Sequence, residues 1–339
     1  MKLFCRLVFA ALLFAGASTF GCELCAIYSA DSARGTSSSG FLVSVAEQFT
    51  AYNTTQFDGE EVPFPDPDFL DNSITHIVPT YNFSPRFGLS LNIPVIYNSF
   101  ERTDVRYFPP PRLPVFETER GSEFGLGDMA LVARGTVWQL DKMDYAISLN
   151  LLAGVKFPTG DSSRIQDEVD QARLFASLLP PGSPHDPLGH SQSALHQDML
   201  ALGSGSWDGV FGVTLNTRWK RWFFNSQFQY YLRTEADDFE FGDDILVSGG
   251  PGRYLVVHDE WTLGLQFNAF YETEARDKIL GVKSDNTGMT AWYVGPQLAL
   301  TWGEHVAVNA GADFPLSIAN NGLQTVPDFR AHGGISFRF

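Results

Sequence analysis

The chain has few charged residues and, after its first 20 positions, no long hydrophobic run. Charged residues make up 18% of its 339 residues, hydrophobic residues 44% and aromatic residues 14%. Without an apolar run of about 18 residues the mature chain is not a helical membrane protein. The aromatic content argues against a disordered chain, because such chains are poor in aromatics and rich in charge. A soluble β protein or a membrane barrel remains.

Basic tracts are also missing. The chain carries 23 Lys and Arg against 39 Asp and Glu, which gives a formal net charge of −16. A nucleic-acid-binding surface needs clustered positive charge. We therefore expect no nucleic-acid partner.

Residues 1–21 have the layout of a secretory signal peptide. Lys2 and Arg6 form a basic start, residues 7–17 form an apolar core, and small residues follow. The core is about eleven residues long, which is too short to cross about 30 Å of hydrocarbon. We expect the mature chain to begin near positions 18–22, outside the cytoplasm.

Cysteine is scarce, with three in the whole chain. Cys5 falls in the predicted signal, so Cys22 and Cys25 remain, in a predicted N-terminal segment at 22–39. We favour a disulfide between them, as suits an oxidising periplasm. A lipid anchor on Cys22 stays an alternative. Haem attachment is excluded, because Ala26 stands where a His is required.

From position 40 onward the hydrophobic pattern has a period of two, which predicts strands with different surroundings on their two faces. In 87–98 the residues Phe87, Leu89 and Leu91 alternate with Gly88, Ser90 and Asn92. Similar rows occupy 145–157, 222–232 and 261–271 and begin and end on aromatic residues, as in strands that cross a membrane. We predict an all-β, transmembrane antiparallel β-barrel of the bacterial outer membrane with about 12 strands over 40–339.

The predicted connections alternate in length. Short ones fall at 84–86, 140–143, 220–221, 259–260 and 303–304, and long ones at 57–73, 100–124, 158–206, 235–244, 276–288 and 318–327. Short periplasmic turns and longer extracellular loops are the rule in outer-membrane barrels of Gram-negative bacteria. The last strand, 328–339, ends on Phe339, as in barrels that are inserted by the barrel-assembly machinery. We therefore expect this machinery and outer-membrane lipid as partners.

Three short motifs carry a resemblance to a known family. These are Pro94-Val95-Ile96-Tyr97, Gly125-Leu126-Gly127-Asp128, which we expect to open a strand, and Pro158-Thr159-Gly160-Asp161, which follows the next one. With them the chain resembles the transporter-like outer-membrane proteins of the phenol-degradation meta-pathway family. The resemblance implies a passive channel for small organic molecules.

The polar faces of the strands predict the lining of the lumen. The charged members that we expect to line a pore are Asp128, Arg134, Lys156, Arg218, Arg233, Asp313, Arg330 and His332. A lumen of mixed charge suits a small polar or aromatic solute. The alternative is that these charges pair across a closed interior.

The connection 158–206 is long enough to have a function of its own. In it Ile165, Val169, Ala172, Phe175, Ala176 and Leu179 recur at helical spacing, which predicts a short amphipathic helix over or inside the pore. His185, Asp186, His190, His196 and Asp198 follow. His185, His190 and His196 are candidate metal ligands, although their spacing matches no known ligand motif.

We expect an outer-membrane channel for passive transport of small organic molecules, with aromatic or hydrophobic ones among the candidate solutes. The alternatives are a structural or surface-interaction barrel with a closed lumen and a metal-ion uptake pore. We expect no cofactor and no enzymatic activity, because Gly189-His190-Ser191-Gln192-Ser193 is not a nucleophile elbow.

Overall fold

The computed structural model describes residues 39–63, 68–106, 115–180, 183–189 and 193–339. The predicted signal peptide, Cys22, Cys25 and His190 lie outside the described residues. The predictions made for them therefore stay predictions.

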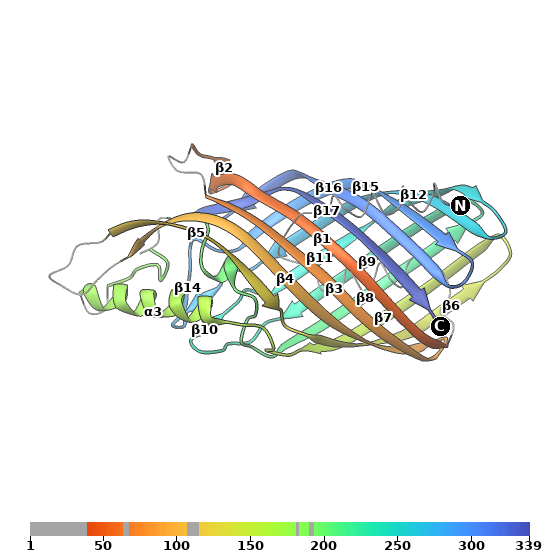
Figure 1. The fold of residues 1–339 in the computed structure, drawn as a ribbon, viewed down its shortest axis with the longest axis horizontal. Helices are drawn as coiled ribbons and strands as arrows, with labels where there is room; N and C mark the ends of the chain where they lie inside the picture. The colour runs from red at the N-terminus through yellow and green to blue at the C-terminus, as the bar shows by residue number, and fades with distance from the viewer. Residues whose placement is uncertain (1–38, 64–67, 107–114, 181–182, 190–192) are drawn as a thin grey trace.

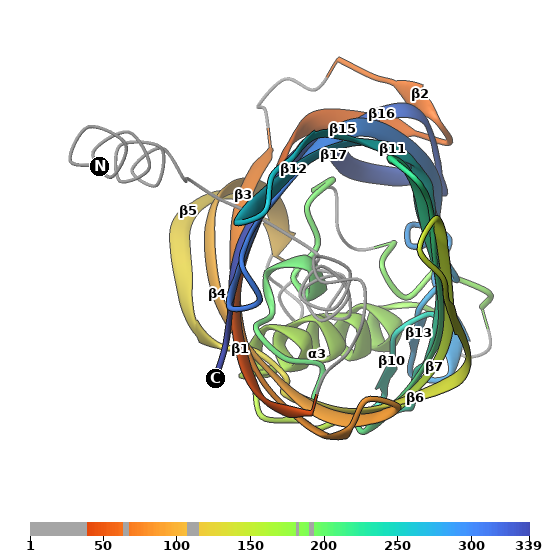
Figure 2. The ribbon, with the colours of Figure 1, turned by 90° about the vertical axis from the view of Figure 1, so that its right-hand side faces the viewer.

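Twelve strands of the described chain form one closed antiparallel barrel (Figures 1 and 2). They are β1 (Gly40–Phe57), β3 (Phe69–Ser84), β4 (Phe87–Arg106), β6 (Ala130–Asp141), β7 (Tyr145–Lys156), β8 (Asp208–Trp219), β9 (Trp222–Leu232), β11 (Asp244–Val257), β12 (Trp261–Glu274), β15 (Met289–Trp302), β16 (Val306–Asn320) and β17 (Leu323–Arg338). The sheet closes where β1 pairs with β17, with Leu42 opposite Arg338. The predicted fold class and strand number are confirmed.

Shorter elements gather at the end of the barrel that carries most of the long connections, here called the loop end; the other end is the turn end (Figure 1). They are β2 (Glu60–Glu61), β5 (Val115–Leu126), α3 (Ser163–Leu178), η1 (Asp198–Leu200), β10 (Phe239–Glu240), β13 (Lys278–Ile279) and β14 (Val282–Lys283). β5 pairs with β4, and β10, β13 and β14 form a small separate sheet.

The alternation with a period of two places one set of side chains inside the barrel and the other set on its outer surface. In β4, Gly88, Ser90 and Asn92 are buried, whereas Phe87 and Tyr97 on the other face are exposed. Many large hydrophobic side chains are exposed in the same way, including Leu151, Val155, Phe211, Phe228, Leu265, Phe267 and Leu298. An apolar outer surface on a closed barrel is the surface that lipid covers.

Exposed aromatic residues occur where the strands end, as the sequence predicts. Trp219, Trp222 and Trp302 flank turns at the turn end, and Trp207 and Trp292 stand near the loop end. Tryptophan prefers the boundary between hydrocarbon and water.

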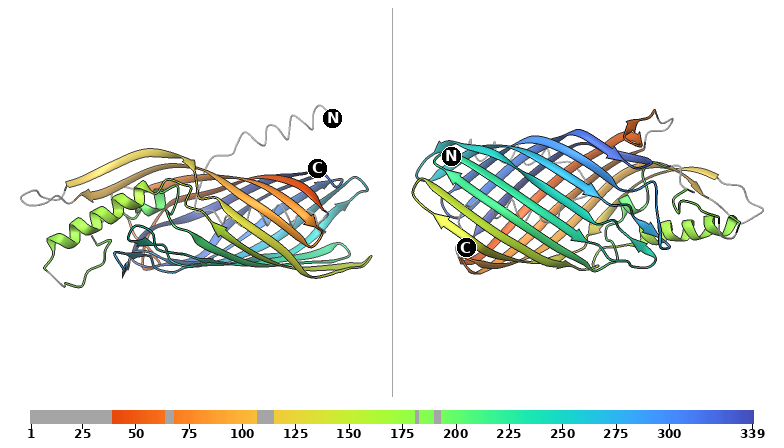
Figure 3. Two further views of the ribbon diagram at one scale, coloured as in Figure 1. Left: turned by 90° about the horizontal axis from the view of Figure 1, so that it is seen from below. Right: turned by 180° about the vertical axis from the view of Figure 1, so that it is seen from behind.

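Two predicted loops are wrong. Residues 100–124 are not a loop, because β4 continues to Arg106 and β5 runs antiparallel to it beyond the barrel (Figure 3). The motif Gly125–Asp128 therefore does not open a strand but lies at the break between β5 and β6. Residues 318–327 are not a long loop either: β16 and β17 are joined by Asn321 and Gly322 alone, and Gly322 has a φ of 60°.

The helix predicted in 158–206 is α3. Ile165, Val169 and Ala172 of the predicted apolar face are buried against Leu188, Phe239 and Ile279. Seen along the barrel, α3 lies across part of the opening (Figure 2), and it extends past the strand ends beside the β4–β5 hairpin (Figure 3). Within the described ranges, no helix has the length and apolar character to cross a membrane.

Candidate functional site

The barrel interior has a polar wall built from strand residues of the inner face. Cross-strand hydrogen bonds join Ser44 with Ser336 (2.8 Å) and Thr80 with Ser90 (2.8 Å). His76 is buried and bonded through Nδ1 to Oδ1 of Asn92 at 3.0 Å. Buried polar groups need such partners, because each was hydrogen-bonded to water before folding.

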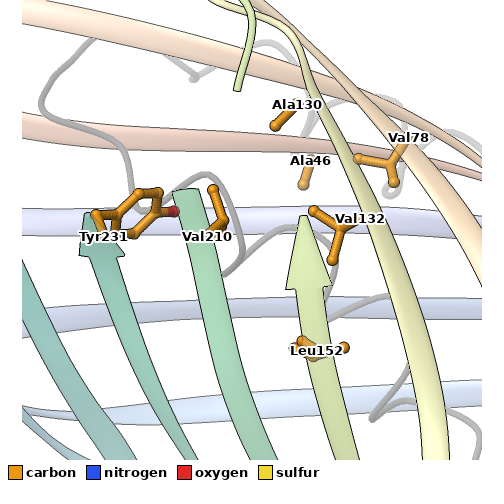
Figure 4. Packing of buried hydrophobic residues seen from close by; sticks show 7 residues of the cluster. All are labelled: Ala46, Val78, Ala130, Val132, Leu152, Val210 and Tyr231. Carbon is orange, nitrogen blue, oxygen red and sulfur yellow. The ribbon is translucent and has the colours of Figure 1, made fainter. Parts of the chain in front are cut away.

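The interior also has an apolar wall (Figure 4). It consists of seven buried side chains on β1, β3 and β6–β9, namely Ala46, Val78, Ala130, Val132, Leu152, Val210 and Tyr231. A solute inside the barrel would therefore meet hydrocarbon as well as hydroxyl, amide and charged groups.

Residues 193–206, the last part of the long connection, lie against the inner face and are here called the plug segment. Leu195 and Leu200 are buried against Tyr52, Leu70 and Phe100. These three wall residues come from β1, β3 and β4. Burial of large aliphatic side chains of this kind contributes about 1.5–3 kcal/mol each, so packing alone holds the plug segment firmly.

Hydrogen bonds to the wall add to this packing. The Asp68 carboxylate accepts from Ser193 Oγ at 2.7 Å and from the Ala194 N–H at 2.9 Å. The Thr325 N–H donates to the Ala194 carbonyl at 2.7 Å, and Asn98 Nδ2 donates to the Leu200 carbonyl at 3.1 Å. The plug segment is thus bonded to strands from both ends of the chain.

Asp128 and Lys156 anchor the other end of the plug segment. The Asp128 carboxylate accepts from the Ser204 N–H (2.8 Å) and Oγ (2.7 Å) and from the Gly160 N–H (2.9 Å). Lys156 Nζ lies 2.6 Å from Asp208, 3.2 Å from Asp128 and 2.8 Å from Ser204 Oγ. Two of the three motifs noted in the sequence therefore meet at the plug segment.

Gly160, in the motif Pro158-Thr159-Gly160-Asp161, is required by a close approach of two backbones. A Cβ atom on Gly160 would lie 2.5 Å from the Leu202 carbonyl oxygen, and one on Gly203 would lie 2.6 Å from Gly160. No larger side chain fits between these segments without moving one of them.

Arg233 belongs to the same network of charged side chains. Its guanidinium contacts Asp208 at 3.1 Å and Asp244 at 2.6 Å. It also lies over the Tyr231 ring, 5.0 Å from the ring centre, which is a cation–π distance. Arg233 is thus paired on two sides.

The remaining predicted pore residues occupy two other places. Arg330 is bonded to Glu272 and lies 4.1 Å from the centre of the Tyr293 ring, and His332 Nδ1 is 3.2 Å from Asp313. Arg134 is buried and donates to Asn82 at 2.8 Å. Arg218 lies 3.7 Å from Asp141 near the turn end and is partly exposed.

The described residues line two cavities inside the barrel. The first, of about 70 Å³, is lined by Asp313, Arg330 and His332 together with amides of β9, β12, β15 and β16. The second, of about 150 Å³, lies at the loop end between the plug segment and the wall and is here called the mouth cavity; Asp128, Lys156 and Arg233 line it. His76 and Leu246 line both cavities, so the two spaces adjoin.

The mouth cavity is rich in carboxylates that sequence reasoning had not grouped. Asp198 of the plug segment is joined there by Asp244, Glu272 and Glu274. Burial, together with the charges of Asp277 and Glu168, raises the pKa of Asp198 well above its usual value. Burial likewise raises the pKa of Asp277, in the β12–β13 connection, to about 7. Alternation in the sequence places Glu272 and Glu274 on the inner face, and the same pattern could have assigned Asp208 and Asp244 to it.

The candidate metal ligands do not form a site in the described part of the chain. His185 Nδ1 is 2.9 Å from the Ser183 carbonyl and its ring packs on Phe175, whereas His196 is buried in the plug segment. No group of three or more His, Cys, Asp or Glu among the described residues is arranged to hold a metal ion. His190 is outside them, so the metal hypothesis stays a prediction.

The closed barrel with a lipid-facing apolar surface defines an outer-membrane β-barrel protein. No family model and no curated protein matches the chain. Among solved structures it is similar to an outer membrane channel from Pseudomonas putida F1, with 12% identity and a TM-score of 0.59. The match covers 90% of this chain and 97% of that chain.

More remote structures include the CymD monoaromatic hydrocarbon channel and the translocator domain of the autotransporter NalP from Neisseria meningitidis. The first has 6% identity, a TM-score of 0.39 and coverage of 96% of this chain and 95% of that chain. The second has 8% identity, a TM-score of 0.40 and 93% coverage of both.

Proposed function

We propose that this protein is an outer-membrane channel for passive transport of small organic molecules, and that the plug segment is its gate. The observation that carries the proposal is the pair of adjoining cavities inside the barrel, which meet at His76 and Leu246. A structural barrel has no need of internal space with both polar and apolar walls. The fold shared with the Pseudomonas putida channel is consistent with it.

The two walls favour solutes that have an apolar body and a polar end. The apolar wall can contact an aliphatic or aromatic body, and inner-face amides such as those of Gln227 and Asn268 can hydrogen-bond a polar group. The mouth cavity is partly closed by Leu202 and Ser204, so passage requires the plug segment to move.

A barrel with a permanently closed lumen is the second candidate, and one observation favours it. Lys156 and Arg233 form ion pairs with carboxylates on neighbouring strands of the inner face, and Arg330 pairs with Glu272 across two intervening strands. Interlocked charges of this kind can fix a closed structure. The metal-uptake pore is a weaker candidate, because the described residues hold no metal-binding group.

The test is uptake of arabinose into proteoliposomes. The full chain is compared with a variant in which residues 162–205 are replaced by a short Gly-Ser linker between β7 and β8. We expect slow uptake with the full chain and uptake at least tenfold faster with the linker variant. If neither admits arabinose although both migrate as folded barrels on unheated gels, the channel proposal is wrong and the closed barrel is correct.

A further inference from the structure

The charges around the mouth cavity do not balance. Five carboxylates line it, against Lys156 and Arg233 as the basic residues. Lys156 and Arg233 are already paired with Asp128, Asp208 and Asp244, and Glu272 is paired with Arg330. Asp198 and Glu274 are left, and neither forms an ion pair with any residue that the structure describes.

Of these two carboxylates, Asp198 has the more specific evidence for a binding role. Its side chain lies on the plug segment, lines the cavity and is 7% exposed. The backbone N–H groups of Asp198 and Met199 bond to its carboxyl group, but its buried Oδ1 atom has no hydrogen-bond donor among the described residues. A buried carboxylate oxygen without a donor or counter-charge is strongly unfavourable, so the position is one that a bound cation would stabilise.

The rest of the cavity wall suits an organic cation better than a metal ion. Met199 and Leu202 of the plug segment and Leu246 of β11 line the same space, and they can contact a hydrocarbon body. A metal would need several ligands at close range, and the described residues provide no such group. An alkyl or aromatic ammonium needs only a carboxylate for its charge and apolar contacts for its body.

We propose that the mouth cavity is a binding site for a small organic cation, an amine with an apolar body. Its positive group is held between Asp198 and Glu274, and its body lies on Met199, Leu202 and Leu246. The inference rests on the proposed function in one respect: it names the class of solute that the proposed channel selects. The site itself requires the cavity and no transport.

The experiment is isothermal titration of the full chain in detergent with benzyltrimethylammonium, an aromatic cation whose charge does not depend on pH. Benzylsulfonate, of similar size and opposite charge, is the matched probe. We expect one cation site and no sulfonate binding. The double variant D198N/E274Q is expected to weaken cation binding at least tenfold, because it removes both carboxyl groups that can ionise to balance the cation while keeping the side-chain shapes.

The variant E60Q/E61Q is the control, since it removes the same charge from β2, where both side chains are exposed at the loop end. It should bind the cation as the unchanged chain does. Equal weakening in both variants, no cation binding, or sulfonate binding of similar strength overturns the proposal. Calcium that displaces the probe and binds more tightly also overturns it, in favour of an inorganic cation site.

Arabinose uptake by the same preparations separates this inference from the proposed function. Cation binding without arabinose uptake by any form, the linker variant included, leaves the site intact and removes the channel. Arabinose uptake that is equal in all variants, without cation binding, keeps the channel and removes the site.

Discussion

Lys156 Nζ lies 2.6 Å from the Asp208 carboxylate, and this pair joins the end of β7 to the start of β8 across the base of the long connection. The side chains are 4% and 0% exposed. Asp128, 3.2 Å from the same ammonium, depends on it as well.

Replacing Lys156 with Met should therefore be strongly destabilising. It leaves buried Asp128 without its counter-charge and Asp208 with Arg233 alone. Breaking a buried pair in this way costs about 3–5 kcal/mol. Urea unfolding in detergent, followed by tryptophan fluorescence, measures the change. Lys283→Met, at an exposed position of β14, is the control and should alter stability little. Similar unfolding midpoints for the two variants would contradict the prediction.

Ser204→Ala should loosen the plug segment and leave the barrel intact. Its hydroxyl donates to Asp128 and accepts from Lys156, and both bonds are lost while the charges stay paired. With a net contribution of about 1 kcal/mol for each such bond, we expect arabinose uptake to rise several-fold with an unchanged barrel unfolding midpoint. Ser163→Ala, at an exposed position of α3, should keep uptake at the original level.

The stability of the loop end should fall as pH rises from about 4 to about 7. Burial raises the pKa of Asp277 to about 7, so the folded protein holds a proton that the unfolded chain releases at an ordinary pKa of 3.8. The stabilisation is full below the lower value and is lost by the upper one. Burial also raises the pKa of Asp198 in the plug segment, so Asp198 acts in the same direction.

Asp277→Asn tests this dependence. The amide stays neutral, so we expect the variant to gain stability over the original chain at pH 8 but not at pH 4. Thermal unfolding of both chains at pH values from 4 to 8 measures the difference. A constant difference across the range would show that Asp277 titrates normally.

Leu151→Arg should hinder insertion into lipid. Leu151 lies near the centre of β7 and is 48% exposed on the outer face. A basic side chain at the bilayer midplane costs about 2–4 kcal/mol. Folding into lipid vesicles, measured by the gel shift of the unheated protein, should decrease markedly for Leu151→Arg and much less for Leu151→Ala. Equal folding of both would show that this face does not meet hydrocarbon.

The barrel was predictable because lipid imposes its pattern on every strand that crosses it. Residues such as Phe87, Leu89 and Leu91 must face hydrocarbon, so the period of two is visible in the sequence. β5 was missed because most of its described side chains are exposed on both faces, and a hairpin that stands in water needs no such pattern. The short turn at Asn321 and Gly322 was missed because Pro327 and Asp328 interrupt the alternation inside β17, so the strand seemed to begin after them.

The site was predictable only in part, for a physical reason. The face of α3 follows from local spacing, and the inner-face charges follow from alternation. The contacts that build the mouth cavity join Asp128 with Ser204 and Asp68 with Ala194, pairs far apart in the chain. Nothing in a local pattern encodes which distant residues the closed barrel brings together.

The seam between β1 and β17 has a consequence for how the protein is made. Leu42 pairs with Arg338, and the Phe339 N–H donates to the Phe41 carbonyl at 3.0 Å. β1 can pair with β3 early, but its other edge stays open until β17 has been synthesised and exported. Until then the growing sheet has two open edges that can pair with any other extended chain. The closing contact is also the one of greatest sequence separation, so its loop entropy makes it a slow step. Protection of the two edges during that interval decides the yield of folded protein.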